Sequence, residues 1–353
     1  MTSVTSVTPV PPVISVTPVT AAASSSIASS SIASSSAAPR LTLWCNGGFH
    51  GSALELLQGG TAHYDLVLDG APESLAEADI AFGQPDETIV LSAPRLKWVH
   101  LSSAGYTRYD RDDVREALEK RGAALTNSSH VYDEPCAQHA FAFMLSLARR
   151  LPQALLLQQT DRKWKSGPLR ADSFLLNGQT VLFLGYGAIG RRLAELLRPL
   201  EMRVIALRRS VPSHPEENGV EVIGADRLAE ALGQADHVMN LLPESPSTLG
   251  FVTADRLAQC RPGTFFYNIG RGATVDQTAL LHALASGQIG AAYLDVTTPE
   301  PLPPTHPLWS APTCFITPHS AGGHHGESER LVRHFLKNLA AWERGEPLMD
   351  RVG

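Results

Sequence analysis

Residues 180–200, TVLFLGYGAIGRRLAELLRPL, decide the fold. The first five residues are apolar or β-branched and predict a buried strand, whereas the leucines after the glycines recur on one face of a predicted helix. Between them, Gly185 permits a tight turn, Gly187 lets a ligand approach the backbone, and Gly190 allows close helix packing. A strand, a glycine loop and an amphipathic helix in this register indicate a dinucleotide-binding unit, and the alternative is a glycine turn without a ligand.

Short apolar stretches alternate with helical or polar stretches on both sides of this unit. The first set of predicted strands covers residues 41–44, 64–68, 80–82 and 96–101, and the second covers 180–184, 203–207, 237–242, 264–269, 291–294 and 314–317. A predicted helix over residues 132–151 joins the two sets, and another covers 327–344. Because strands that alternate with helices form parallel sheets, we expect an α/β protein whose second sheet is doubly wound.

The composition excludes several classes of function. The chain has 353 residues, with 29 Lys and Arg against 35 Asp and Glu. The resulting net charge of −6 argues against nucleic-acid or membrane partners that bind through bulk positive charge. No apolar run approaches the ~18 residues of a membrane span. The four cysteines form no C-x-x-C motif and no disulfide framework, which favours a reducing, cytoplasmic setting.

Residues 1–39 differ in composition from the rest of the chain. They contain no charged residue, and 17 of the 39 are Ser or Thr. Such a segment buries too little apolar surface to offset the entropy of ordering it, so we expect a disordered, low-complexity tail. The alternatives are an over-long start site and a Ser-rich transit peptide of the plastid type. Folded protein is expected from Arg40 onward.

The residues after the second strand of the dinucleotide unit bear on the cofactor. A site for NAD usually has an Asp or Glu about 20 residues after the glycines, which binds the ribose 2′-hydroxyl. Here the strand is followed by Arg208, Arg209 and Ser210, whose donor groups suit a 2′-phosphate instead. We therefore expect NADP(H) in preference to NAD(H). The alternative is that these arginines belong to a solvated loop.

Three polar residues follow later strands of the same sheet. Arg271 lies between two glycines, Glu300 between two prolines, and His319 after a Thr-Pro pair. Arginine pairs with carboxylates, a Glu flanked by prolines is held on a stiff loop, and histidine exchanges protons near neutral pH. Since ligands bind at the carboxyl ends of such strands, we expect these three to be catalytic, although each alone is also typical of a surface loop. His324 and His325 have no Cys nearby, and no metal site is expected.

Taken together, these motifs resemble the D-isomer-specific 2-hydroxyacid dehydrogenases, most closely their glyoxylate/hydroxypyruvate reductase branch. The resemblance rests on the glycine loop, on Asn268-Ile269-Gly270-Arg271-Gly272 with Val275-Asp276, on Leu294-Asp295-Val296 leading to Glu300-Pro301-Leu302-Pro303, and on Thr317-Pro318-His319-Ser320-Ala321-Gly322. It implies two α/β domains of the Rossmann or flavodoxin type, with the cofactor domain inserted into the substrate domain. The expected boundaries are 40–128 and 321–353 for the substrate domain and 129–320 for the NAD(P)-binding domain.

The resemblance also implies roles for individual residues. In that family the arginine binds the substrate's carboxylate and keto oxygen, the histidine is the acid and base, and the glutamate orients and charges it. Substrate binding is expected at Ser103, Ala104, Gly105, Arg271 and His319, because the small residues of the segment 102–105 expose backbone N–H groups to an anion. Cofactor binding is expected at Gly185, Tyr186, Gly187, Ala188, Ile189, Gly190, Arg208, Arg209, Ser210, Leu242, Pro243, Ile269, Gly270, Arg271, Asp295 and His319.

The expected activity is hydride transfer between NADPH and a small 2-keto acid or D-2-hydroxy acid. A non-catalytic, nucleotide-sensing regulator, as in the family's corepressors, is the alternative. Glu300 speaks against formate dehydrogenases, which have Gln there, and the end of the chain after residue 344 speaks against phosphoglycerate dehydrogenases with an extra domain. The size of the substrate's side chain is expected to depend on the loop around Phe82-Gly83-Gln84 and on aromatic residues such as Tyr106 and Trp342. We expect a homodimer through the cofactor domains.

Overall fold

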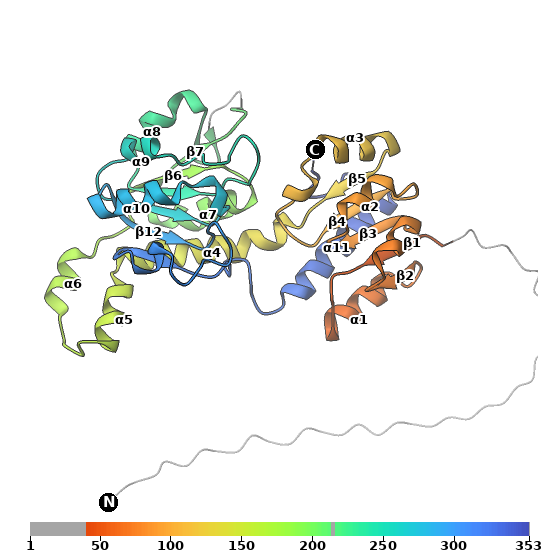
Figure 1. Ribbon diagram of the computed structural model, residues 1–353, viewed down its shortest axis with the longest axis horizontal. Coiled ribbons are helices and arrows are strands. Elements are labelled where there is room, and N and C mark those ends of the chain that lie inside the picture. The colour runs from red at the N-terminus through yellow and green to blue at the C-terminus, as the bar shows by residue number, and fades with distance from the viewer. Residues whose placement is uncertain (1–39, 213–215, 353) are drawn as a thin grey trace, which may run out of the picture. The chain divides into compact units, whose positions relative to one another are not determined.

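The computed structural model of this protein describes residues 40–212 and 216–352 (Figure 1). Two sheets of five and eight strands make up this part of the chain, and helices cover both faces of each sheet. This architecture confirms the predicted α/β class with two doubly wound domains. The tail expected over residues 1–39 lies outside the described residues.

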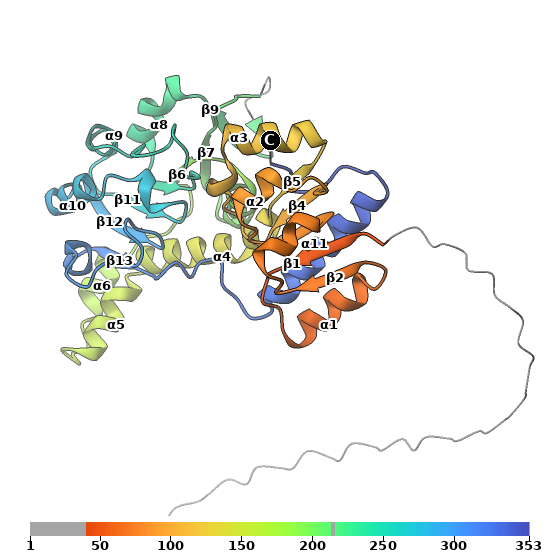
Figure 2. The ribbon, with the colours of Figure 1, turned by 45° about the vertical axis from the view of Figure 1, so that its right-hand side comes forward.

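The five-stranded sheet is entirely parallel, in the order β2-β1-β3-β4-β5. Its strands are β1 (Thr42–Cys45), β2 (Asp65–Leu68), β3 (Ile80–Gly83), β4 (Trp98–Leu101) and β5 (Ala124–Thr126). On one face lie α1 (Gly51–Gly60) and α11 (Glu327–Glu343), which Figure 2 shows beside β1, and on the other lie α2 (Glu87–Ser92) and α3 (Asp112–Arg121). Short 3-10 helices cover Pro72–Glu77 (η1) and Thr107–Tyr109 (η2). Side chains alternate across a strand, so Leu43 enters one core and Trp44 the other.

Both ends of the described chain belong to this first sheet. Phe335 of α11 is fully buried and stacks on Phe82 at a ring-centroid distance of 4.2 Å and on Trp98 at 5.3 Å. Arg351 forms an antiparallel bridge with Thr126 of β5. The chain thus leaves the five-stranded sheet, builds the eight-stranded sheet and returns, as the predicted insertion requires. The exact domain boundaries at residues 128 and 320 stay predictions.

The eight-stranded sheet has the order β13-β12-β11-β10-β6-β7-β9-β8 and is parallel except for β8. Its strands are β6 (Thr180–Leu184), β7 (Arg203–Leu207), β8 (Glu216–Glu217), β9 (Val220–Ile223), β10 (His237–Asn240), β11 (Thr264–Asn268), β12 (Ile289–Leu294) and β13 (Cys314–Ile316). On one face lie α4 (Ser129–Ala148) and α7 (Ala188–Leu197), and on the other α8 (Leu228–Gln234), α9 (Ala254–Gln259) and α10 (Gln277–Ser286). The remaining helices are α5 (Leu151–Gln159), α6 (Ser166–Asp172) and the 3-10 helices η3 (Arg198–Leu200), η4 (Ala225–Arg227), η5 (Gly272–Thr274) and η6 (Pro307–Ser310).

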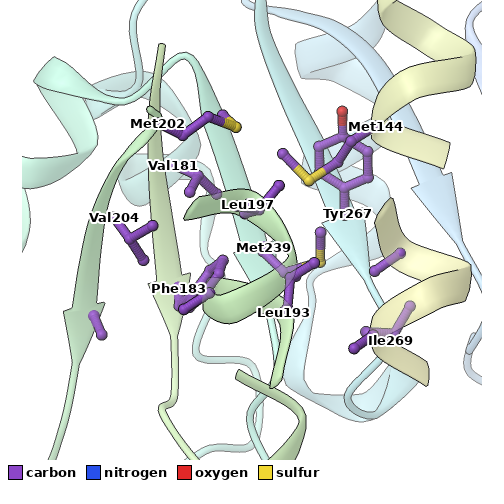
Figure 3. Close-up of a cluster of buried hydrophobic side chains, with 14 of the residues drawn as sticks. Met144, Val181, Phe183, Leu193, Leu197, Met202, Val204, Met239, Tyr267 and Ile269 are labelled. Carbon is purple, nitrogen blue, oxygen red and sulfur yellow. The ribbon is translucent and has the colours of Figure 1, made fainter. Parts of the chain in front are cut away.

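The glycine-loop helix α7 packs directly on its sheet. Figure 3 shows Leu193 and Leu197 of α7 against Phe183 of β6 and Met239 of β10, and all four are buried. A Cβ atom at Gly190 would lie 3.2 Å from both Leu241 Cδ1 and Tyr186 Cδ2. A side chain at this position of α7 would require Leu241 or Tyr186 to shift, which favours glycine there.

The structure differs from the predicted elements at several places. Strands β5, β8 and β9 were not predicted, because β5 has three residues, β8 consists of two glutamates, and the short apolar run of β9 is interrupted by Glu221. The helix predicted over 132–151 starts at Ser129 and is interrupted after Ala148, where Arg150 has a left-handed φ of +55°. No single helix of the described residues is long and apolar enough to cross a membrane. Helices α4 and α5 are together long and apolar enough, but this pair is bent by 70°. Helix α4 packs into the core of the eight-stranded domain.

Candidate active site

The glycine loop opens onto a pocket of about 270 Å³ at the carboxyl ends of β6, β10 and β11. Gly185 has a φ of +96°, and a Cβ atom at Gly187 would meet no other atom within 4 Å. The first backbone N–H groups of any helix have no partner within the helix. At α7 the N-cap is Gly187, which has no side chain to accept from them. The N-terminus of a helix with such free donors attracts phosphate groups, so this end of the pocket fits a pyrophosphate.

Most residues predicted to bind the cofactor or substrate line this one pocket. The loops after β10 and β11 contact each other closely, because a Cβ atom at Gly270 would lie 2.6 Å from the carbonyl oxygen of Leu242. Lining residues are Ala104, Gly105, Tyr106, Thr107, Ser129, Gly185, Tyr186, Gly187, Ala188, Ile189, Gly190, Leu241, Leu242, Pro243, Glu244, Ile269, Gly270 and Arg271. Tyr106 was expected to influence the size of the substrate, whereas Thr107, Ser129, Leu241 and Glu244 were not predicted.

Arg208, Arg209 and Ser210 follow β7 directly and lie outside the residues that line the pocket. The backbone N–H of Arg208 donates to the carbonyl oxygen of Ile223, and the side chains of Arg209 and Ser210 are exposed. Burial raises the pKa of Tyr106, Asp110 adds to the rise, and Arg209 opposes it. The Arg209 guanidinium is therefore close enough to act on Tyr106, which does line the pocket.

Arg271 meets the segment 102–105 across the pocket. Its Nη1 donates to the carbonyl oxygen of Gly270 at 2.6 Å, and its Nη2 lies directly against Gly105. The guanidinium of Arg271 and the backbone of Gly105 therefore face the same space. A planar cation and backbone N–H groups in such a position suit a small carboxylate.

The segment 102–105 turns its carbonyl groups away and leaves N–H groups free. The carbonyl oxygen of Ser102 accepts from the Tyr132 hydroxyl at 3.0 Å, that of Ser103 from the Ser128 N–H at 3.0 Å, that of Ala104 from Asn127 Nδ2 at 2.8 Å, and that of Gly105 from the Ser103 hydroxyl at 2.6 Å. Among the described residues, none accepts a hydrogen bond from the backbone N–H of Ser103, Ala104 or Gly105. Successive free N–H groups of this kind form an anion-binding concavity.

His319 and Glu300 form a hydrogen-bonded pair. His319 Nδ1 lies 2.8 Å from Glu300 Oε2, and Glu300 Oε1 accepts from the Thr297 N–H at 2.9 Å. An ionised carboxylate only accepts, so Nδ1 carries the proton of this bond and Nε2 is left for a ligand. The two side chains are 53% and 37% exposed, and both line a second pocket of about 390 Å³. Its other lining residues are Asp295, Thr297, Pro301, Leu302, Trp309, Ile316, Thr317 and Pro318.

Asp295 holds the loop that carries His319. Its side chain is almost fully buried and accepts from the Thr317 hydroxyl at 2.6 Å, from the Ser320 N–H at 2.9 Å and from the Ala321 N–H at 3.1 Å. Its carbonyl oxygen accepts from the N–H of His319, whose φ is +50°. Asp295 lines the pocket of His319 and not that of the glycine loop, so its predicted contact with the cofactor stays a prediction.

Cysteine chemistry is not available beside the site. Burial raises the pKa of the Cys136 thiol to about 12, Asp295 adds to the rise and Arg271 opposes it. Cys136 therefore stays protonated at neutral pH, and both charged residues lie close enough to act on it. Over residues 40–212 and 216–352, no three His, Cys, Asp or Glu side chains are grouped so that they could hold a metal ion.

Comparisons with known proteins agree with this geometry. Residues 141–321 match the family described as "D-isomer specific 2-hydroxyacid dehydrogenase, NAD binding domain". The glyoxylate reductase of Korarchaeum cryptofilum is 32% identical over 266 residues, 74% of this chain and 77% of that protein. The human glyoxylate reductase/hydroxypyruvate reductase is 32% identical over 261 residues, 73% of this chain and 77% of that protein. A D-isomer specific 2-hydroxyacid dehydrogenase from Xanthobacter autotrophicus Py2, solved with NADPH and MES, is 26% identical with a TM-score of 0.75, covering 89% of this chain and 98% of that one.

Proposed function

This chain belongs to the D-isomer-specific 2-hydroxyacid dehydrogenases, and on that basis we propose that it reduces a small 2-keto acid of the glyoxylate or hydroxypyruvate type with NADPH. The observation that carries the proposal is the 2.8 Å hydrogen bond between His319 and Glu300 at the edge of a sheet that also carries Arg271. Reduction of a 2-keto acid requires a group that donates a proton to the keto oxygen and a cation that binds the carboxylate. A nucleotide-sensing regulator needs neither of them.

The glycine loop and the N-terminus of α7 would hold the dinucleotide, and Arg208, Arg209 and Ser210 would bind its 2′-phosphate. When bound, NADPH supplies the hydride that the keto carbon receives. The preference for NADPH is supported by the donor groups after β7 and by the NADPH bound to the Xanthobacter relative.

The substrate's carboxylate would lie between the guanidinium of Arg271 and the free N–H groups of Ser103, Ala104 and Gly105. Arg271 would also stabilise the negative charge that grows on the keto oxygen. His319 would give its Nε2 proton to that oxygen while Glu300 stabilises the imidazolium at Nδ1. The product is then a 2-hydroxy acid, and His319 regains its proton from solvent.

The experiment follows the loss of NADPH absorbance with glyoxylate, with hydroxypyruvate and with a bulkier 2-keto acid. Turnover of at least one is expected, and His319→Asn is expected to lower kcat by about 10²- to 10⁴-fold, the usual contribution of a general acid. Asparagine is chosen because it tolerates the left-handed backbone of His319. No turnover across the panel would favour the regulator, and near-wild-type turnover by His319→Asn would remove His319 as the acid.

We propose further that two copies of the chain associate through the cofactor domains. In support, Leu155 and Leu156 of α5 are 58% and 59% exposed, and Trp164, in the segment that leads to α6, is 96% exposed. Large apolar side chains gathered in one segment are typical of a surface that another protein covers. The four free cysteines support the proposal that the enzyme works in the reducing cytoplasm.

A further inference from the structure

Gln84 lies at the carboxyl end of β3, where the backbone is tightly fixed. Gly83 has a φ of +132°, and the carboxamide of Asn46 brackets Gln84 from the other side. Asn46 Oδ1 accepts from the N–H of Gln84 at 2.7 Å, and Asn46 Nδ2 donates to its carbonyl oxygen at 3.0 Å. The direction in which the Gln84 side chain leaves the sheet is therefore set by two backbone hydrogen bonds.

The carboxamide of Gln84 connects Arg108 to the segment 102–105. Arg108 Nη2 donates to Gln84 Oε1 at 3.1 Å, and Gln84 Nε2 lies 3.2 Å from the hydroxyl of Ser102 and 3.0 Å from that of Ser103. A guanidinium can only donate, so Oε1 faces Arg108 and the amide nitrogen must face the serines. The donor groups of the Arg108 guanidinium therefore fix the orientation of the Gln84 amide.

This orientation decides where the proton of Ser103 goes. The Ser103 oxygen accepts from Gln84, and its own proton is donated to the carbonyl oxygen of Gly105 at 2.6 Å. If position 84 accepted instead, the hydroxyl would turn toward it and the Gly105 carbonyl would lose its donor. An unpaired carbonyl oxygen next to an anion site repels the anion, whereas a paired one keeps the N–H side of the segment directed at it.

We propose that Gln84 is a positioning residue for the substrate's carboxylate, because it directs the Ser103 proton to Gly105 and so holds the N–H groups of residues 103–105 toward the anion. This role rests on the proposed function. Gln84 and Ser103 line neither the pocket of the glycine loop nor that of His319, whereas Ala104 and Gly105 line the first of these, so Gln84 acts through the segment 102–105 and not by touching the ligand. The sequence predicted instead that the loop around residue 84 contacts the substrate's side chain.

The test compares two substitutions of Gln84 with a matched control. Gln84→Met keeps the length of the side chain and removes the donor, and Gln84→Glu keeps the acceptor for Arg108 but would draw the Ser103 proton to itself. Both are expected to raise the KM for glyoxylate, Gln84→Met by about 2- to 10-fold as for one neutral hydrogen bond, and Gln84→Glu by more. The kcat and the KM for NADPH are expected to stay within about twofold of wild type, because the hydride and proton donors are untouched.

Gln234 of α8 provides the control, because it has the same hydrogen-bond pattern far along the chain. Its Oε1 accepts from Arg203 at 2.8 Å and its Nε2 donates to Glu230 at 3.0 Å. Gln234→Met is expected to leave all three kinetic constants unchanged. It therefore measures what the loss of an Arg-bound carboxamide does by itself.

A double-mutant cycle asks whether Gln84 acts through Ser103. In a Ser103→Ala background, which keeps the backbone N–H groups, Gln84→Met is expected to raise the KM for glyoxylate no further. An equal rise in the KM for glyoxylate in both backgrounds would contradict the proposal that Gln84 acts through Ser103. A wild-type KM for Gln84→Met, or a matching rise in its KM for NADPH, would contradict it as well. Each of these leaves the proposed function standing. A wild-type enzyme that reduces no 2-keto acid would instead overturn both.

Discussion

The Nη2 atom of Arg271 occupies the space that a Cβ atom would need at Gly105. A loop of the five-stranded domain and a loop of the eight-stranded domain therefore meet at a point where a Cβ atom would displace the Arg271 guanidinium. The contact joins the proposed carboxylate-binding segment to the arginine that would share the same carboxylate.

Gly105→Ala is expected to lower kcat/KM for the 2-keto acid by about 10- to 100-fold. The reason is that the displaced guanidinium can no longer make a charge-assisted hydrogen bond, and a loss of this size is typical of such a bond. The free energy of unfolding should change little, because Arg271 can move the end of its flexible side chain. Gly59→Ala on α1 is the control, since a Cβ atom there meets nothing within 4 Å. Steady-state kinetics and urea unfolding check both variants. Wild-type kinetics for Gly105→Ala would place the Arg271 guanidinium elsewhere in the working enzyme.

The wild-type enzyme is expected to have a higher kcat/KM with NADPH than with NADH, and Arg209→Ala to reduce that ratio by about 10-fold or more through the loss of a charged phosphate contact. Arg203 lies at the other end of β7, where it pairs with Glu221 at 2.8 Å. Arg203→Ala should leave the ratio unchanged. An intrinsic preference for NADH would remove the phosphate role of the arginines and leave the fold untouched.

Light scattering is expected to report a dimer for the wild type and a smaller mass for Leu156→Asp, because a carboxylate cannot be buried in an apolar contact without a partner. Leu249 is exposed to a similar degree, 56% against 59% for Leu156, but lies in the loop after β10. Leu249→Asp should keep the mass of the wild type. A monomeric wild type, or a dimer that survives Leu156→Asp, would argue against contact through α5.

Acid should destabilise the fold through His237 of β10. Its ring nitrogens lie 3.0 Å from the Tyr267 hydroxyl and 2.6 Å from Gln179 Oε1, and burial lowers its pKa from 6.5 to about 4. Between these pH values the unfolded chain binds a proton that the folded chain does not, so this contribution is complete above pH 6.5 and falls as pH drops toward 4. His237 alone should lower the free energy of unfolding by about 1.4 kcal/mol for each pH unit in that range.

His237→Gln isolates this effect, because buried His100, whose pKa burial lowers to about 3, acts in the same direction in both proteins. Urea unfolding at pH 7 and pH 5 measures the difference. The variant is expected to lose less stability between the two pH values than the wild type does. Equal losses would show that His237 is not the group that binds the proton on unfolding.

The parts of the fold that the sequence predicts are those in which local pattern and packing agree. The bounds of strands β6 and β7 were predicted correctly, because each strand has at least four consecutive apolar residues that are buried on both faces of the sheet. Strand β5 was missed because its three residues, Ala124–Thr126, owe their pairing to neighbours distant in the chain.

The residues of the candidate site also divide into those that the sequence pattern indicates and those that depend on contacts in space. Arg271, Glu300 and His319 were predicted because strand ends and flanking glycines or prolines mark them in the sequence, and their catalytic roles stay predictions. The role inferred for Gln84 could not be found that way, because it depends on where Arg108 and Ser103 lie in space. Asp295 was predicted through the family resemblance to bind the cofactor, whereas its hydrogen bonds to the loop of His319 depend on the register of β12 and β13.

The stacking of Phe335 on Phe82 and Trp98 bears on the order in which the two domains complete their folding during synthesis. The strands of the first sheet are synthesised first, yet the aromatic ring that covers their inner face arrives only with the last helix. Since domains fold as units while the chain emerges, the nucleotide-binding portion can finish before the portion that precedes it. Until α11 has been synthesised, this face of the N-terminal strands therefore lacks the aromatic ring that covers it in the folded protein.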